Sequence, residues 1–121
     1  MKRLPLIGAV ALAVLCLSSC GTGTAVNDAR AACRIIHRGL AEQKASLNPH
    51  LTSAQRNALQ SQALGTVLSA QRDAANATTA DGSWNPLQTT IEEANRVPLR
   101  YEVVALTRIC QVADSSSPYL V

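Results

Sequence analysis

Apolar residues recur every three or four positions along most of the chain from residue 28 onward. This spacing places them on one side of a helix, and it predicts helices over residues 28–47, 52–79, 86–96 and 98–113. The first two stripes contain Ala29, Cys33, Ile36, Leu40 and Leu47, and then Leu59, Ala63, Val67, Ala70 and Ala74. The last two contain Leu87, Ile91 and Ala94, and then Leu99, Val103, Leu106, Cys110 and Ala113. No sustained alternation with a period of two is present, so the predicted fold class is all-α, a small three- or four-helix bundle.

Local signals indicate where these helices begin and end. Asn27 or Asp28 is a suitable cap for the first helix, and Asn48-Pro49 ends it because the residue before a proline avoids the helical region. Thr52 and Gln55 have the spacing of a capping box and start the second helix.

Trp84 is expected to fold its indole onto the core just before the third helix, which Asn85 is expected to cap. Val97-Pro98 then interrupts the apolar pattern. Proline inside a helical pattern either kinks or ends a helix, so residues 86–96 and 98–113 form either one kinked helix or two.

The first 19 residues have the pattern of an export signal. Lys2 and Arg3 precede an uncharged, mostly apolar run over residues 4–17, which is short for a membrane span of about 20 residues. The run ends in Leu17-Ser18-Ser19-Cys20, which resembles the lipobox of bacterial lipoproteins, where small residues precede a cysteine. The resemblance implies cleavage before Cys20, a diacylglycerol on its thiol, and a chain anchored at the extracytoplasmic face of the cell membrane.

An uncleaved signal anchor is the alternative, because the uncharged stretch continues to residue 27. Glycine and threonine in that stretch favour a flexible tether instead. We therefore predict four parts: a signal peptide over 1–19, the lipidated Cys20 with its tether over 20–27, a helical domain over 28–114, and a disordered tail over 115–121.

The four cysteines each acquire a role under this interpretation. Cys16 leaves with the signal peptide and Cys20 is acylated, so Cys33 and Cys110 remain. In an oxidising compartment such a pair is most simply a disulfide, and each cysteine falls on the apolar stripe of its own helix. A redox-active pair is the alternative, but the Cys-x-x-Cys spacing is lacking. A bridge this long stabilises by roughly 4 kcal/mol in the chain-entropy model.

Charge and aromatic content argue against nucleic-acid binding. Without Lys2 and Arg3, 9 basic residues face 8 acidic ones, so the net charge of the mature chain is close to neutral. Trp84, Tyr101 and Tyr119 are the aromatic residues, too few for the stacking surfaces of single-stranded nucleic-acid proteins and of many sugar sites.

Arg30, Arg34 and Arg38 recur at four-residue spacing and share one side of the first helix. They could contact anionic lipid headgroups beside the tether. The alternative is an ordinary solvated surface, in which Glu42 pairs with Arg38 at helical spacing.

His37 and His50 are the histidines of the chain, and neither has a Cys, Asp or Glu at a recognised ligand spacing. We therefore expect no metal and no other cofactor. An enzyme would need one of these histidines to meet a carboxylate in a concave site, and no motif supports that.

Taken whole, the chain resembles small actinobacterial lipoproteins with a lipobox, a Thr/Gly-rich tether, and an alanine-rich helical domain with one cysteine near each end. The resemblance implies a membrane-anchored module of uncharacterised activity. The function predicted first is interaction with an envelope protein. A small-ligand binder, with a pocket near Trp84, Tyr101 and the arginine row, is the alternative.

Overall fold

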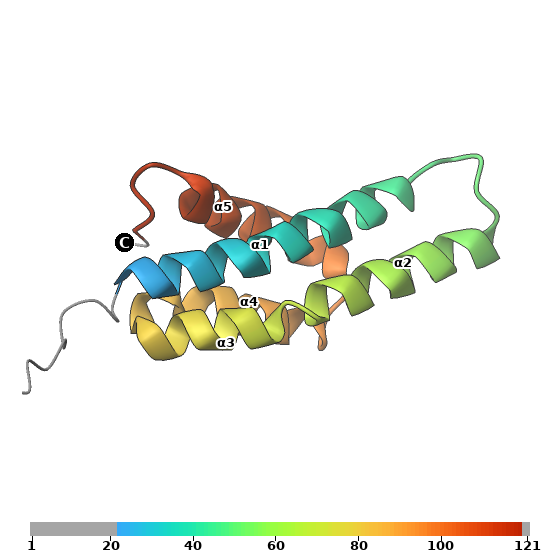
Figure 1. Ribbon diagram of the computed structural model, residues 1–121. Coiled ribbons are helices and arrows are strands. Elements are labelled where there is room, and N and C mark those ends of the chain that lie inside the picture. The colour runs from blue at the N-terminus through green and yellow to red at the C-terminus, as the bar shows by residue number, and fades with distance from the viewer. Residues whose placement is uncertain (1–21, 120–121) are drawn as a thin grey trace, which may run out of the picture.

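The computed structural model describes residues 22–119, which form five α-helices, two short 3₁₀ turns and no strand. In chain order the elements are α1 Thr22–Ala45, α2 Ser53–Leu68, α3 Gln71–Ala80, η1 Gly82–Trp84, α4 Asn85–Ala94, η2 Leu99–Tyr101 and α5 Val103–Asp114. Because α2 and α3 follow one another almost in line, four helical rods pack together (Figure 1). The predicted all-α bundle is confirmed.

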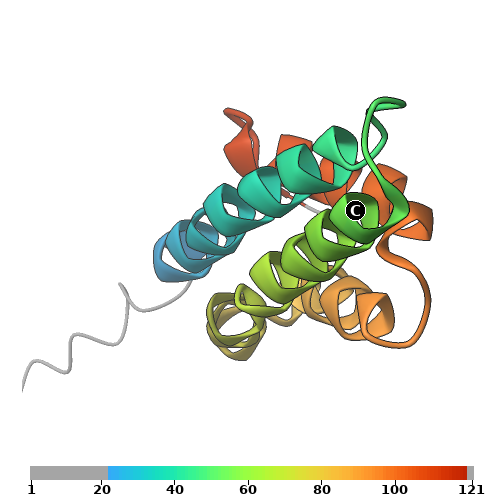
Figure 2. The same cartoon turned by 90° about the vertical axis from the view of Figure 1, so that its right-hand side faces the viewer.

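Helix α1 runs along the length of the molecule and contacts α2, α3 and α5 (Figure 1). Helix α4 packs against α2, α3 and α5 on the other side of the core. The last turns of α1 and the first turns of α2 project beyond α4 and α5, and Figure 2, which faces that end, shows α1 and α2 running side by side. We call residues 40–62 the hairpin tip.

Helix α1 begins at Thr22, well before the predicted start at residue 28. Ala25 is fully buried and Val26 packs against the core, so the apolar stripe of α1 extends by one further turn. The prediction of a flexible tether is therefore wrong for residues 22–27, because burial of these small side chains outweighs the low helix propensity of glycine and threonine. The predicted signal peptide over residues 1–19 and the predicted lipidation site Cys20 lie outside the described residues.

The helix predicted over 52–79 starts as expected but is broken in the middle. The Thr52 hydroxyl accepts from the Gln55 N–H and the Gln55 side chain accepts from the Thr52 N–H, which confirms the capping box. At the break, the Ser69 hydroxyl donates to the Thr66 carbonyl at 2.6 Å and the Ala70 N–H donates to the Val67 carbonyl at 3.0 Å. Serine competes for the helix carbonyls and the turn tightens, so α2 ends and α3 restarts at a small angle.

Trp84 is 1% exposed, as predicted, but the start of α4 differs from the expected one. Asn85 is the first helical residue rather than the cap, and Trp84 occupies the cap position. The turn before it is held by the Asp81 carboxylate, which accepts from the Ser83 N–H at 3.0 Å. Because the indole is buried, α4 begins at Asn85, one residue earlier than predicted. No side chain caps this helix, and the 3₁₀ turn η1 leads directly into it.

The interruption at Val97-Pro98 separates two helices rather than kinking one. Helix α4 ends at Ala94, residues 95–98 form a connection, and the turn η2 leads into α5. Helix α5 ends at Asp114, where the predicted domain also ends. Residues 115–119 have no regular secondary structure.

Alanine is the commonest residue of the buried core. Small side chains let helix axes approach closely, and the closest approach lies at Gly39 of α1. A Cβ built there would lie 2.7 Å from Val67 Cγ2 and 3.1 Å from the Ala63 carbonyl oxygen. Glycine is therefore required for α1 to pack on α2 at this depth.

Candidate functional site

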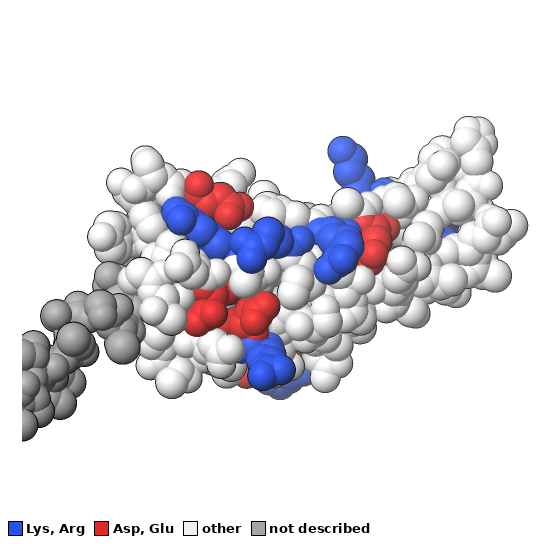
Figure 3. Space-filling view, viewed as in Figure 1, with Lys and Arg blue, Asp and Glu red and all other residues white. Residues whose placement is uncertain are grey.

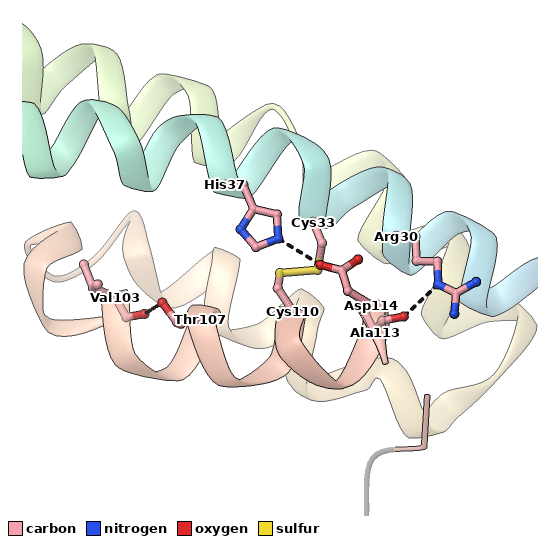
Figure 4. The surroundings of a disulfide bond; sticks show 8 residues. All are labelled: Arg30, Cys33, His37, Val103, Thr107, Cys110, Ala113 and Asp114. Carbon is pink, nitrogen blue, oxygen red and sulfur yellow. Dashed lines mark hydrogen bonds and ion pairs between the residues drawn. A yellow bond between two sulfur atoms is a disulfide. The ribbon is translucent and has the colours of Figure 1, made fainter. Parts of the chain in front are cut away.

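The disulfide between Cys33 and Cys110 joins α1 to α5, with the two Cα atoms 5.4 Å apart (Figure 4). Both cysteines are fully buried. The predicted bridge is confirmed, and it links the first and last helices of the chain.

Arg30 lies on the same side of α1 as the disulfide and reaches the C-terminal end of α5 (Figure 4). Its Nε donates to the Ala113 carbonyl at 2.8 Å and its Nη2 to the Ser115 carbonyl at 3.1 Å. The last carbonyls of a helix carry partial negative charge and lack helical partners, so a guanidinium stabilises them. Arg30 thus stabilises the packing of α5 on α1. It also binds the backbone of Ser115, the first residue of the predicted disordered tail.

His37 meets Asp114 at 2.9 Å, measured from Nε2 to Oδ2 (Figure 4). The two side chains are 50% and 46% exposed. The sequence offered His37 no carboxylate at a recognised ligand spacing, but α5 supplies one from 77 residues away. No spacing rule finds such a pair, because it depends on how two helices are placed.

Arg34 and Arg38 remain exposed on α1, next to Asp73 of α3, with which they line a shallow hollow. The ion pair predicted between Glu42 and Arg38 does not form. The Glu42 carboxylate accepts instead from the Thr66 hydroxyl at 2.7 Å and from the Gln62 amide at 3.2 Å, both on α2. Figure 3 shows a row of basic side chains along α1 with acidic side chains on both sides of it. The predicted lipid contact thus has two remaining candidates, Arg34 and Arg38.

An apolar groove of about 530 Å³ lies between the second half of α1 and the first turns of α5. We call it the α1/α5 groove. Leu47 and Val104, which line it, are 67% and 68% exposed, and Leu40 and Val103 contribute further apolar surface. Lys44 and Arg100 line it too, with His37 toward the disulfide. Among the described residues that line the groove there is no carboxylate. The stripe pattern predicted Leu40, Leu47 and Val103 as core, and it could not tell which apolar residues a neighbouring helix would leave uncovered.

A second pocket, of about 270 Å³, lies between α2 and residues 97–100. We call it the amide pocket because the side-chain amides of Gln43, Asn57 and Gln60 line it, together with Ser61. The segment from Val97 to Arg100 closes one wall. Sequence analysis did not single out these amides, because scattered Gln and Asn residues carry no motif.

The ligand pocket predicted near Trp84, Tyr101 and the arginine row does not form as expected. Trp84 is buried in the core and lines none of the three pockets described above. Tyr101 is 65% exposed, and its ring carries the Arg100 guanidinium 4.8 Å from its centre. Trp84 offers almost no surface to a ligand, because its indole is buried in the core as expected.

His50 is exposed in the loop between α1 and α2, where its backbone N–H donates to Asn48 Oδ1 at 3.0 Å. Within residues 22–119, no group of three or more His, Cys, Asp or Glu side chains is arranged as a metal site. None of the described helices is both long and apolar enough to cross a membrane.

Comparison of the chain with protein-family models, with curated proteins and with solved structures finds no match.

Proposed function

We propose that this protein is a membrane-anchored interaction module that binds an acidic, amphipathic helix of an envelope protein in the α1/α5 groove. The anchor is the acylated Cys20, and the proposal of it rests on the lipobox-like sequence before that residue. The observation that carries the binding role is the groove itself, where Leu47 and Val104 are about two-thirds exposed beside Lys44 and Arg100.

The shape of the groove supports a helical occupant. It lies between two helices, and one wall runs from His37 to Lys44 of α1, a rise of about 10 Å at 1.5 Å per residue. Leu47, in the turn after α1, continues this wall. That length matches about two turns of a third helix laid along the groove. Helix-in-groove recognition uses apolar anchors at positions i, i+4 and i+7 on the bound helix, and Leu40, Leu47 and Val104 offer the apolar surface for them.

The charge of the groove supports an acidic occupant. Lys44 and Arg100 line it, and no carboxylate is among the described residues that line it. His37 adds no unpaired charge, because its imidazole is paired with the Asp114 carboxylate. Complementary charge raises the association rate and excludes partners of the wrong sign. A helix with apolar anchors and flanking Glu or Asp residues therefore fits this surface better than a neutral or basic one.

A membrane surface fits less well. The groove is concave, whereas insertion into a bilayer needs protruding apolar side chains. Arg30 is occupied by the end of α5, and Asp73 lies beside Arg34 and Arg38. The test below also detects the alternative, in which Arg34 and Arg38 contact anionic headgroups.

The anchor is tested by mass spectrometry of the chain recovered from its host. A mature N-terminus at Cys20 with a diacylglyceryl mass is the expected result, and Cys20→Ala should release the protein from membranes. An intact, unacylated N-terminus would exclude the anchor.

The groove is tested with a fluorescently labelled peptide that has leucines at i, i+4 and i+7 and glutamates on the flanking positions. The full-length chain should bind it saturably, and the substitution Val104→Asp should weaken binding at least about tenfold, because it removes an anchor and adds a like charge. An acidic residue is favoured in the first turn of α5, so this variant should fold.

Tyr119→Asp is the matched control, because Tyr119 is 66% exposed and does not line the groove. Its peptide affinity should equal that of the unaltered chain. Equal loss in both variants, or equal binding of a peptide with lysines in place of the glutamates, would contradict the proposal. Binding of vesicles with anionic headgroups that Arg34→Gln/Arg38→Gln abolishes, without any peptide binding, would replace it with the membrane role.

A further inference from the structure

The amide pocket offers carboxamide groups, on Asn57 and Gln60, that the proposed interaction module does not use. It adjoins the α1/α5 groove, because Gln43 and Arg100 line both. Its polar wall comes from α1 and α2, and its apolar wall comes from Leu64 and the segment 97–99.

Gln43 is the unusual residue of this pocket. It is only 6% exposed, and its side-chain amide makes no hydrogen bond with any other described residue, although its backbone carbonyl accepts from the Ser46 hydroxyl at 2.6 Å. No side-chain nitrogen or oxygen in residues 22–119 is completely buried without a partner. The Gln43 amide therefore retains some exposed surface. Because Gln43 lines the amide pocket, its amide can offer a ligand there one carbonyl acceptor and two N–H donors.

The other polar side chains of the amide pocket are also free to bind a ligand. Asn57, Gln60 and Ser61 make no side-chain hydrogen bond within the described chain. A peptide-like amide, which has one donor and one acceptor, can pair with two such carboxamides. A buried polar group gains most from a partner when water reaches it poorly, and this applies to Gln43.

Arg100 gives the pocket its charge. Its Nη2 donates to the Tyr101 hydroxyl at 3.2 Å and its guanidinium lies over the Tyr101 ring, so Tyr101 positions the cation. The described lining residues contain no carboxylate to balance it. A guanidinium pairs best with a carboxylate, and a ligand ammonium would have no partner here.

From these features we infer that the amide pocket binds an N-acylated α-amino acid with a free carboxylate. The carboxylate pairs with Arg100, the acyl amide pairs with Gln43 and its neighbours, and a short apolar side chain packs against Leu64 and Leu99. The volume of about 270 Å³ suits this size, since a cavity of about 150 Å³ takes a benzene molecule. The same chemistry occurs at the C-terminal end of a peptide.

The test is a titration of the ¹⁵N-labelled full-length chain with N-acetyl-L-alanine, followed by NMR. Saturable shifts are expected at the backbone amides of Ser61, Leu99 and Arg100. The dissociation constant should lie on the order of 1 mM, which is usual for about nine non-hydrogen atoms. N-acetyl-alanine amide, which lacks the carboxylate, and free alanine, which carries an ammonium, should each bind at least about tenfold more weakly.

Three variants locate the site. Arg100→Gln should weaken binding about tenfold and Gln43→Met about fivefold, through the lost ion pair and hydrogen bonds. Ser61→Leu fills the pocket from an exposed position, so it should fold and abolish binding even if Gln43→Met does not fold. Arg96→Gln is the matched control, because Arg96 is an exposed arginine outside the pocket, and it should bind as the unaltered chain does.

Two variants separate this inference from the proposed function. Leu47→Ala removes a groove anchor without placing a carboxylate beside Arg100, so it should weaken binding of the helical peptide and leave N-acetyl-alanine binding unchanged. Ser61→Leu should leave binding of the helical peptide unchanged. Tighter binding of N-acetyl-tetra-alanine than of N-acetyl-alanine identifies a peptide end as the source of the ligand, and equal binding identifies a free small molecule. Absence of saturable shifts, or equal affinity for the carboxylate and the amide, would overturn the inference.

Discussion

Around the disulfide, α1 buries apolar residues at every turn from Ala25 to Ile36, whereas the hairpin tip, residues 40–62, buries only Gln43 and Ser46. The first region is closed by Cys33–Cys110 and by Arg30, which binds the end of α5. The tip is held instead by local polar contacts, such as the capping box at Thr52. Both the α1/α5 groove and the amide pocket lie where the well-packed region gives way to the tip.

The difference shows how a small domain can keep binding surface without losing its fold. A small domain buries a smaller share of its surface than a large one, so a cross-link at one end adds a large fraction of its stability. The other end can then leave apolar and amide groups uncovered. Three substitutions test this division, beginning with the largest expected effect.

Replacing both bridge cysteines, as Cys33→Ser/Cys110→Ser, should lower the free energy of unfolding by about 4 kcal/mol. The bridge joins residues 77 apart, so its loss frees nearly the whole domain in the unfolded state. Urea unfolding followed by far-UV circular dichroism measures the change, and reduction of the unaltered chain should shift the midpoint equally. An unchanged midpoint would place the stability in the packing instead.

Gly39→Ala tests the close approach of α1 and α2 at the boundary of the two regions. The new Cβ would meet Val67 Cγ2 at 2.7 Å, and overpacking of this kind costs about 1–3 kcal/mol, which exceeds the helix-propensity gain of about 1 kcal/mol. Gly65→Ala on α2 is the matched control, because nothing lies within 4 Å of its Cβ, and it should stabilise the protein by up to about 1 kcal/mol. Thermal melts of the two variants should move in opposite directions, and a shift in the same direction would refute the close packing.

Thr52→Ala removes the capping box of α2 and should cost about 1 kcal/mol. Because the hairpin tip lacks buried apolar residues, the effect should be local, with faster hydrogen exchange in the first turns of α2 and little change around the disulfide. Thr79→Ala is the control, since the Thr79 hydroxyl donates only to the Ala75 carbonyl of its own helix. Uniformly faster exchange throughout the domain would mean that the two regions unfold as one unit.

The sequence predicted the helices better than their ends. Periodicity located every rod, and the capping box fixed the start of α2, because both depend on residues three or four apart. It missed the break at Ser69 and the early start of α1 at Thr22. Each depends on packing between helices: Ala25 is helical because it is buried, and the turn at Ser69 lets α2 and α3 both lie on α1.

The candidate site was predicted less well. The bridge cysteines were found because each lies on an apolar stripe, and export is expected to leave only these two thiols. The contacts of Arg30 and His37 with the end of α5, and the amide pocket around Gln43, were not found. Arg30, Arg34 and Arg38 were predicted to form one exposed surface, although Arg30 is hydrogen-bonded to the end of α5.

On its own, the sequence thus determined that this protein is helical, where each helical rod lies, and which two cysteines could be joined. It could do so because helix formation depends on residues three or four positions apart. The tertiary structure alone decided which apolar residues stay uncovered between α1 and α5, which carboxylate meets His37, and why the Gln43 amide faces a pocket. Those features depend on the relative placement of helices, and small alanine side chains permit that placement without specifying it in any local pattern.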